Sequence, residues 1–369
     1  MESLDVFTQD QLEEALARPD VIPVCSGEGS FEVGGDHFVR GADSARIRLR
    51  DSAAVEAGGR TSVVASDTTE VTARHSATVE LSDSARARAY GRVSVRAMDH
   101  ARVTAAGETI VEATDEASVT VLSMAIVRAT DRCSVRALAN ARVHLSGDAR
   151  AWAWGTCAVR ALDSASVSAW GSASVLATGS AVVEARENAV VVAGGSVVVR
   201  AFGAAMVRAR GKAHVDGADG VSVMRHGGGV VHGSGIAEPT RFTTPAEWCA
   251  YYGVAVENGV ATLYKALNED FVSYHGTSYL PGTEPAAEDW DGGERECGGG
   301  LHFSPLPTLA LPHPDDVMRF VACPVRLDDM AVHPNGHYPA TVKARRVCAP
   351  VYEVHEDRSR VEAPTSPGA

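Results

Sequence analysis

The 369-residue sequence is poor in aromatic side chains and has no long apolar run. Only 6% of its residues are aromatic although 45% are hydrophobic, so alanine and valine must fill most of any core. No apolar run approaches the roughly 18 residues that a membrane-spanning helix needs. The N-terminus also lacks the basic and apolar regions of a secretory signal. We therefore expect a cytoplasmic protein with no membrane partner.

Paired cysteine spacing is missing as well. The seven cysteines are an odd number without close pairs. This pattern favours reduced thiols over a disulfide scaffold, which agrees with a cytoplasmic location.

The formal net charge of −13 argues against general nucleic-acid binding. The charge is unevenly distributed, because residues 44–235 carry 22 Lys or Arg against 18 Asp or Glu. Arginine alternates there with acidic residues, which is typical of a solvated, charge-balanced surface. We expect no nucleic-acid partner.

What the sequence contains instead is an eight-residue repeat. From Ser44 to Gly235 the chain divides into 24 consecutive octads without an insertion or deletion. Position 4 is Val in 21 octads, and positions 2 and 6 are Ala in 15 and 17. Such alternation predicts a strand with one buried face. Position 8 is Asp or Gly in 20 octads, which predicts a turn, because Gly tolerates positive φ and Asp can hydrogen-bond its own following backbone.

Residues of like type recur every 16 positions rather than every 24. Turn-position Asp recurs at this spacing from Asp67 to Asp131. At position 5 the same spacing forms a column of alternating charge: Glu80, Arg96, Glu112 and Arg128. Opposite charges on adjacent strands are mutually favourable. A coil is therefore predicted to contain two octads, whose strands face each other across a thin core.

Tandem short strands in unbroken register predict a β-solenoid. The expected fold class is mainly β, a capped β-solenoid of eight-residue strands, two per 16-residue coil, followed by a small α+β domain. We expect a capping helix and strand at 1–27, the solenoid at 28–235, the small domain at 240–355 and a disordered tail at 356–369. In the cap, a helix should begin at Thr8, use Leu12, Ala15 and Leu16 as its apolar stripe, and end at Pro19.

Two features of the repeat suggest chemistry but are interpreted here as structural. Cys133 and Cys157 occupy position 2, where Ala is usual, so we expect small core residues rather than catalytic thiols. The aligned Asp residues could in principle hold cations, but capping of the turns accounts for them more simply.

Position 7 carries an apolar column in the even-numbered octads, counted from the octad that begins at Ser44. Its apolar members are Leu122, Leu138, Trp154, Trp170 and Phe202, and Trp152 points outward nearby. Soluble proteins seldom leave large contiguous apolar patches exposed. Two interpretations remain open. Either this stripe docks a second copy, a protein partner or the C-terminal domain, or its residues pack only on one another over the edge of the thin core.

From about Thr240 the octad stops, and Trp, Tyr, Pro and His become common. Residues 243–253 predict a helix with Thr at the cap, Pro in the first turn and Gly253 at its end. Asn258-Gly259 between alternating apolar runs predicts a hairpin. Segments 319–327 and 341–354 predict two further strands.

Three segments in residues 260–355, "LYKALNEDF", "YLPGT" and "RECGGGLHFSPLPTLAL", resemble a domain of unknown function found in phage, prophage and bacterial proteins. In that family a lysine-bearing first strand precedes a Tyr-x-x-Gly segment and a Cys-x-x-Gly-Leu/Phe-His motif. The matching residues here are Lys265, Cys297, Gly300, Leu301 and His302. Three glycines follow Cys297 and precede Leu301. Relatives often carry Ala/Gly-rich repeats beside this domain, so the resemblance implies an architecture and no established activity.

Three hypotheses for the C-terminal domain remain open. In the first, His275 and Phe303 lie in segments that resemble those of ADP-ribosyltransferases. That resemblance implies a histidine that orients the NAD ribose, an aromatic that stacks on nicotinamide and a late-strand carboxylate, Glu353. In the second, zinc is held by Cys297, His302, Cys323 and Cys348, although paired Cys-x-x-Cys spacing is absent. In the third, the domain is a non-catalytic binding or assembly module.

We expect the third, a structural or interaction protein without a cofactor, whose solenoid presents the C-terminal domain. Its partner would be another protein or a second copy, bound through the apolar stripe. The alternative is an NAD-dependent, ADP-ribosyltransferase-like activity in the C-terminal domain.

Overall fold

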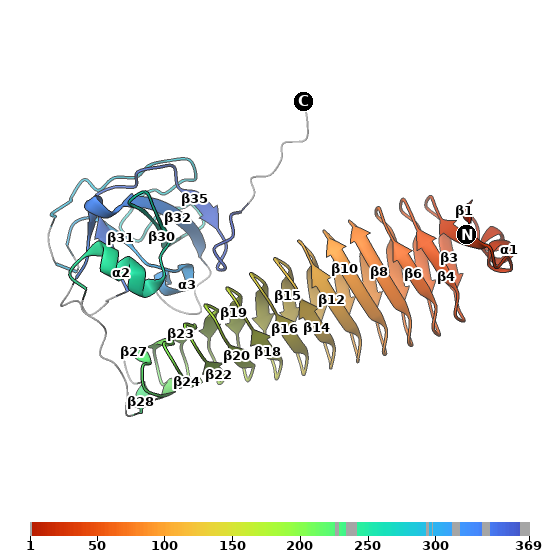
Figure 1. Ribbon diagram of the computed structural model, residues 1–369, viewed down its shortest axis with the longest axis horizontal. Coiled ribbons are helices and arrows are strands. Elements are labelled where there is room, and N and C mark those ends of the chain that lie inside the picture. The colour runs from red at the N-terminus through yellow and green to blue at the C-terminus, as the bar shows by residue number, and fades with distance from the viewer. Residues whose placement is uncertain are drawn as a thin grey trace. The chain divides into compact units, whose positions relative to one another are not determined.

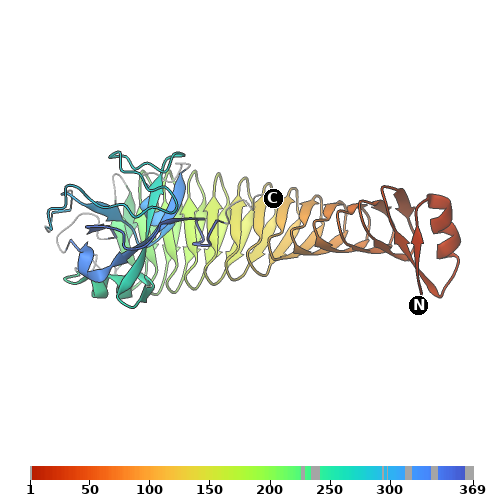
Figure 2. The same cartoon turned by 90° about the horizontal axis from the view of Figure 1, so that it is seen from above.

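The computed structural model describes residues 2–225, 229–233, 242–292, 295–296, 298–311, 318–333 and 340–361. It confirms the β-solenoid, with about 14 turns and equivalent strands about 16 residues apart. The chain divides into two compact units, Met1–Ala189 and Val190–Ala369. Figure 1 shows the stacked strands of the first unit, and Figure 2 shows the same strands from above. No helix among the described residues is long and apolar enough to cross a bilayer.

The solenoid strands form two parallel sheets. The first sheet contains β1 (Glu2–Val6), β2 (Val21–Cys25), β4 (Phe38–Gly41), β6 (Ala54–Ala57), β8 (Glu70–His75), β10 (Arg86–Gly91), β12 (Arg102–Ala106), β14 (Ser118–Val121), β16 (Ser134–Ala137), β18 (Arg150–Ala153), β20 (Ser166–Ala169), β22 (Val182–Ala185), β24 (Val198–Ala201), β26 (His214–Gly217) and β28 (Val230–His232). The second contains β3 (Ser30–Val33), β5 (Arg46–Leu49), β7 (Ser62–Ala65), β9 (Thr78–Leu81), β11 (Ser94–Ala97), β13 (Ile110–Ala113), β15 (Ile126–Ala129), β17 (Arg142–Leu145), β19 (Ala158–Ala161), β21 (Ser174–Ala177), β23 (Val190–Ala193), β25 (Met206–Ala209) and β27 (Ser222–Arg225).

Most octads contribute a four-residue strand, from positions 3 to 6, and not a strand of eight residues. The other four positions form the turn, in which the N–H at position 2 donates to the carbonyl at position 7, as Ala101 does to Met98 at 3.0 Å. The inward positions are buried throughout the first unit, with Val127 and Ala125 at 0% exposure. Cys133 and Cys157 are also at 0%, and burial raises the pKa of the Cys133 thiol to about 11. Both are core residues, as expected.

The parallel register confirms the two-octad coil. Arg96 pairs with Glu80 on one side and with Glu112 on the other. Of these two carboxylates, Glu112 forms the ion pair, at 3.7 Å. Both partners are more than half exposed, so the pair adds little stability. The charge column therefore indicates the register of the strands but contributes little to the stability of the solenoid.

The turn aspartates bond differently from the sequence-based expectation. Asp99 has a φ of 54°, and its N–H donates to the carboxylate of Asp115 one coil later at 3.3 Å. Asp83 bonds Asp99 in the same way at 3.0 Å. The expectation that each Asp caps its own following backbone was wrong, because the left-handed turn leaves its N–H to the carboxylate of the next coil. We call this series, from Asp51 to Asp131, the aspartate ladder.

The N-terminal end is closed by α1 (Gln9–Leu16), drawn in red in Figure 2. Thr8 caps this helix, and Leu12 and Ala15 are buried, as expected. Gln9 also covers the open edge of β3. Its Nε2 donates to the Glu32 carbonyl at 3.2 Å, and its Oε1 accepts from the Glu32 N–H at 2.9 Å. One side-chain amide thus replaces a missing strand at a sheet edge, where unpaired backbone would invite another chain.

The C-terminal domain within the second unit contains two small sheets. One has the order β29-β30-β32-β35 and the other the order β31-β34-β33. The elements are α2 (Pro245–Tyr252), β29 (Val256–Glu257), β30 (Val260–Leu267), β31 (Leu301–Phe303), α3 (Pro307–Ala310), β32 (Arg319–Arg326), the 3-10 helix η1 (Leu327–Asp329), β33 (Met330–Ala331), β34 (Val342–Ala344) and β35 (Tyr352–Val354).

Local signals predicted much of this domain. Thr244 caps α2 in a capping box with Glu247, and Gly253 ends it at a φ of 63°. The hairpin of β29 and β30 turns at Asn258 and Gly259, both with positive φ.

Two expectations for the end of the chain need correction. The single strand expected at 341–354 is two strands, β34 and β35, which belong to different sheets. Pro350 lies between them and has no N–H to donate to a ladder. Residues 356–361, expected to begin a disordered tail, turn back so that the Val361 N–H donates to the Glu353 carbonyl at 2.9 Å. Residues 362–369 lie outside the described part of the chain.

Candidate functional site

The C-terminal domain contains a pocket of about 1090 Å³. It lies where β30 and β31 meet loop residues 275–278, 286–289, 296 and 298–300. Its walls are formed by Lys265, His275, Gly276, Thr277, Ser278, Ala286, Ala287, Glu288, Asp289, Glu296, Gly298, Gly299, Gly300, Leu301, His302 and Thr341. Three motif residues singled out from the sequence, Gly300, Leu301 and His302, line it together with Lys265.

Lys265 is a half-buried amine on β30 that lines this pocket. Its Nζ donates to the carbonyl of His302 at 2.8 Å. The same nitrogen lies 5.3 Å from the ring centre of Tyr279 and 5.8 Å from that of Phe303. Burial lowers the pKa of Lys265 to about 8, and neighbouring Cys323 opposes that shift. Among the described residues no carboxylate pairs with this amine, and an amine packed against aromatic rings loses solvation of its charged form, which explains the direction.

His302 on β31 is fixed by the loop before it. Its Nε2 lies 3.0 Å from the carbonyl of Glu296. Because a carbonyl only accepts, Nε2 carries the proton, and in the neutral ring Nδ1 is an acceptor. Burial lowers the pKa of His302 although the Glu296 carbonyl opposes this, and the Lys265 and Lys343 charges add to the lowering. The ring is therefore held neutral at the pocket wall.

The glycine loop is fastened by two aspartates that sequence reasoning missed. The Gly299 N–H donates to the Asp291 carboxylate, and the Gly300 N–H to that of Asp289, both at 3.0 Å. Lys343 on β34 is fully buried and pairs with Asp291 at 2.7 Å. A Cβ on Gly299 would overlap the Asp289 carbonyl. The glycines after Cys297 are thus required by this close crossing of two loop segments.

Lys343 was missed as well, although its residue type is a detectable signal. The chain contains three lysines, Lys212, Lys265 and Lys343, against 31 arginines. Two of the three lysines lie at or beside this pocket, and Lys212 is exposed on a solenoid turn. A chain that uses arginine for nearly all its positive charge and lysine at one buried site marks those positions. The carboxylate partners, 52 residues from Lys343 for Asp291, have no such signal.

The three residues of the ADP-ribosyltransferase hypothesis occupy different environments. His275 is exposed and lines the pocket. Phe303 is 1% exposed and packs edge-on against Tyr279. Glu353 on β35 pairs with Arg319 at 3.2 Å. Of the three, His275 alone is among the residues that line the pocket.

The four residues of the zinc hypothesis are only partly described. Cys297 lies outside the described residues, Cys323 is fully buried on β32, and Cys348 is half-buried. Among the described residues, no group of three or more His, Cys, Asp or Glu side chains is placed to hold a metal ion.

The apolar stripe forms one column, as the register predicts. Leu122 and Leu138 are 45% and 37% exposed. Trp154 and Trp170, one coil apart, are half-buried and stack with ring centres 4.9 Å apart and an angle of 8°. Both interpretations thus have support, since the leucines face solvent while the tryptophans cover each other. Phe202 is half-buried and belongs to the second unit.

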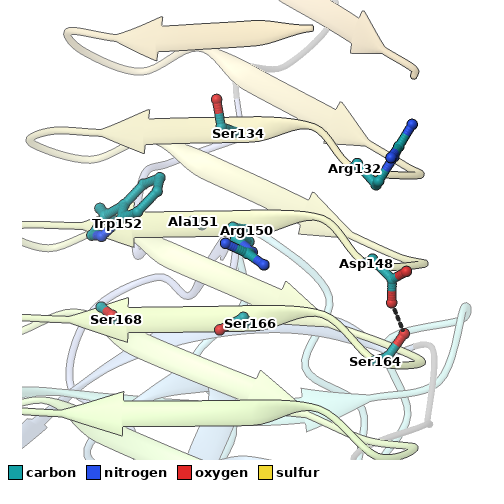
Figure 3. Close-up of a pocket in the computed structure, with 9 residues that line it drawn as sticks. All are labelled: Arg132, Ser134, Asp148, Arg150, Ala151, Trp152, Ser164, Ser166 and Ser168. Carbon is teal, nitrogen blue, oxygen red and sulfur yellow. Dashed lines mark hydrogen bonds between the residues drawn. The ribbon is translucent and has the colours of Figure 1, made fainter. Parts of the chain in front are cut away.

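Trp152 lies at a separate hollow of about 660 Å³ on the first sheet. Figure 3 shows Trp152 and Arg150 on β18 between serines of the two neighbouring strands. The hollow is lined by Arg132, Ser134, Asp148, Arg150, Ala151, Trp152, Ser164, Ser166 and Ser168. Trp152 is half-buried, and its partners in the register are Arg136 on β16 and Ser168 on β20. At the turn, Ser164 donates to Asp148 at 2.6 Å, as the dashed line in Figure 3 marks.

Comparisons of the chain with protein-family models, with curated proteins and with solved structures found no match. We therefore infer the function from the pocket in the C-terminal domain and from the apolar stripe of the solenoid.

Proposed function

We propose that the protein is a non-catalytic interaction protein, in which a β-solenoid presents a C-terminal domain that binds a small ligand. The observation that carries this proposal is the pocket of about 1090 Å³, whose polar wall groups are fixed by the hydrogen bonds that they donate to Glu296, Asp289 and Asp291. Fixed polar groups in a concave site are typical of ligand recognition. The described inward positions of the solenoid are mostly Ala and Val, and they pack as a core.

We propose further that the apolar stripe binds a second copy or another protein. The exposure of Leu122 and Leu138 supports this. Sedimentation velocity of the full chain tests self-association. Trp154→Ser and Trp170→Ser should leave the fold intact and lower the size of any oligomer, whereas loss of folding would favour self-packing. A monomer at all concentrations would remove self-association and leave a different protein as the partner.

The cytoplasmic location and the phage association belong to the same proposal. None of the six described cysteines forms a disulfide, which supports a reducing compartment. The phage association rests on the resemblance of residues 260–355.

A second candidate, NAD-dependent ADP-ribosyl transfer, is favoured by one observation, the position of His275 on the pocket wall. Titration calorimetry of the full chain with NAD decides between the two. Binding of NAD that is lost in His275→Ala would support the transferase, whereas no heat would remove it and leave the pocket to other ligands.

A further inference from the structure

The environment of the pocket lysine differs from that of Lys343 and of the arginines in the C-terminal domain that form ion pairs. Lys343 is fully buried and paired with Asp291 at 2.7 Å. Arg319 pairs with Glu353, and Arg346 pairs with Asp329. Lys265 has a carbonyl and two aromatic rings as its neighbours. No carboxylate pairs with its Nζ among the described residues. An ion pair would hold the amine protonated, whereas this environment does not.

The identity of the side chain also matters. A chain with 31 arginines places lysine here, although arginine offers more hydrogen bonds for anion recognition. Lysine has what guanidinium lacks, a nitrogen that can lose its proton and act as a nucleophile. The lowered pKa of Lys265, about 8, agrees with the geometry, because at pH 8 about half of such amines are neutral, against about 0.4% for an ordinary lysine.

We propose that Lys265 captures a small aldehyde or ketone in this pocket as a reversible imine. This rests on the proposed ligand-binding function and names its substrate class. The Nζ lone pair attacks the carbonyl carbon, and the carbonyl oxygen takes up the proton that nitrogen releases. The resulting carbinolamine loses water, so that the C–O bond breaks as the C=N bond forms. Hydrolysis reverses the sequence, and no oxidant or reductant is needed.

The surroundings of Lys265 suit this step. Tyr279 is 1% exposed and Phe303 is 1% exposed, so the cage around the amine is apolar and fixed. The charged or titratable groups around the pocket include Tyr279, Cys323 on β32, His302 on β31, Lys343 on β34, His275, Glu288, Asp289 and Glu296. Burial raises the pKa of the Cys323 thiol far above its usual range, so the thiol does not compete as a nucleophile.

The test uses the full chain with benzaldehyde and sodium cyanoborohydride at pH 8, which reduces any imine to a stable benzylamine. Peptide mass mapping then compares Lys265 with Lys212 in the same molecule. We expect Lys265 to be labelled at least tenfold faster, since burial offsets part of the difference in neutral amine. Labelling of Lys265 no faster than Lys212 overturns the proposal, whatever any variant does. Lys212→Arg is the matched control and should leave Lys265 labelling unchanged.

Lys265→Arg separates the imine from the pocket. Calorimetry with benzaldehyde alone, without reductant, is run on the wild type and on Lys265→Arg, with circular dichroism to confirm folding. Heat that disappears in Lys265→Arg, together with selective labelling, supports capture. Equal heat in both without selective labelling rejects the imine but leaves a ligand-binding pocket. No heat and no label in the wild type contradict both the imine and binding of this class of ligand.

Discussion

The solenoid and the C-terminal domain are stabilised by different kinds of contact. In the solenoid, each residue meets its own equivalent 16 positions away, as Val111 meets Val127. In the C-terminal domain, the decisive contacts join unlike residues far apart in sequence, such as Lys265 and His302, or Lys343 and Asp291. The same substitution should therefore have a similar effect on stability in different coils of the solenoid. A substitution in the C-terminal domain can instead remove a contact that has no duplicate.

The largest difference in stability between the two regions should come from substitution of a glycine in the C-terminal domain. Gly299→Ala would drive a Cβ into the Asp289 carbonyl, and we expect it to destabilise the C-terminal domain by more than about 4 kcal/mol. Urea unfolding combined with hydrogen exchange measures this by region. The solenoid strands should keep their protection.

Gly253→Ala is the matched control, because its φ is 63° but nothing lies within 4 Å of the added Cβ. It should cost only about 1–2 kcal/mol, the price of a left-handed alanine. Equal effects of the two substitutions would show that the loop crossing at Gly299 yields without cost.

A smaller and uniform effect is expected from the solenoid core. Val127→Ala removes two buried methyl groups and should cost about 2 kcal/mol. Because repeats contact only their neighbours, Val63→Ala should cost the same. Urea midpoints of the two variants test this, with exposed Arg128→Ala expected within about 0.5 kcal/mol of the wild type. A severalfold difference between Val63 and Val127 would contradict the equivalence of coils.

The edge of the solenoid should respond less. Trp170→Ser removes the ring that stacks on Trp154 at 4.9 Å, and we expect a loss of about 1 kcal/mol. Near-ultraviolet circular dichroism and the melting temperature report the stack and its contribution. Trp152→Ser is the control, since no ring contact involves Trp152 among the described aromatic pairs, and its signal change should be smaller.

The smallest effect concerns pH. The Thr130 hydroxyl, and after it the Asp115 N–H, lowers the pKa of Asp131. A carboxyl whose pKa is lowered on folding stabilises the protein above its unfolded pKa of about 3.9, and this stability is lost as pH falls toward the folded value. Below about pH 4 the urea midpoint should therefore fall more steeply for the wild type than for Asp131→Asn. Identical slopes would mean that the aspartate ladder acts without its charge.

The sequence by itself determined the solenoid, its 16-residue coil, the column of Leu122, Leu138, Trp154 and Trp170, and the capped ends of α1 and α2. These follow from alternation, turn residues and caps, each of which acts within a few positions or at one fixed spacing. Tertiary structure decided the rest. It placed each carboxylate of the aspartate ladder to accept a hydrogen bond from the coil before. It also brought the Gln9 amide to the backbone of Glu32 at the edge of β3. It also brought Lys265, His302 and the glycine loop to one pocket, with Lys343 and Asp291 behind it. These contacts depend on how segments far apart in the sequence cross in space, and no local pattern in the chain encodes such a crossing.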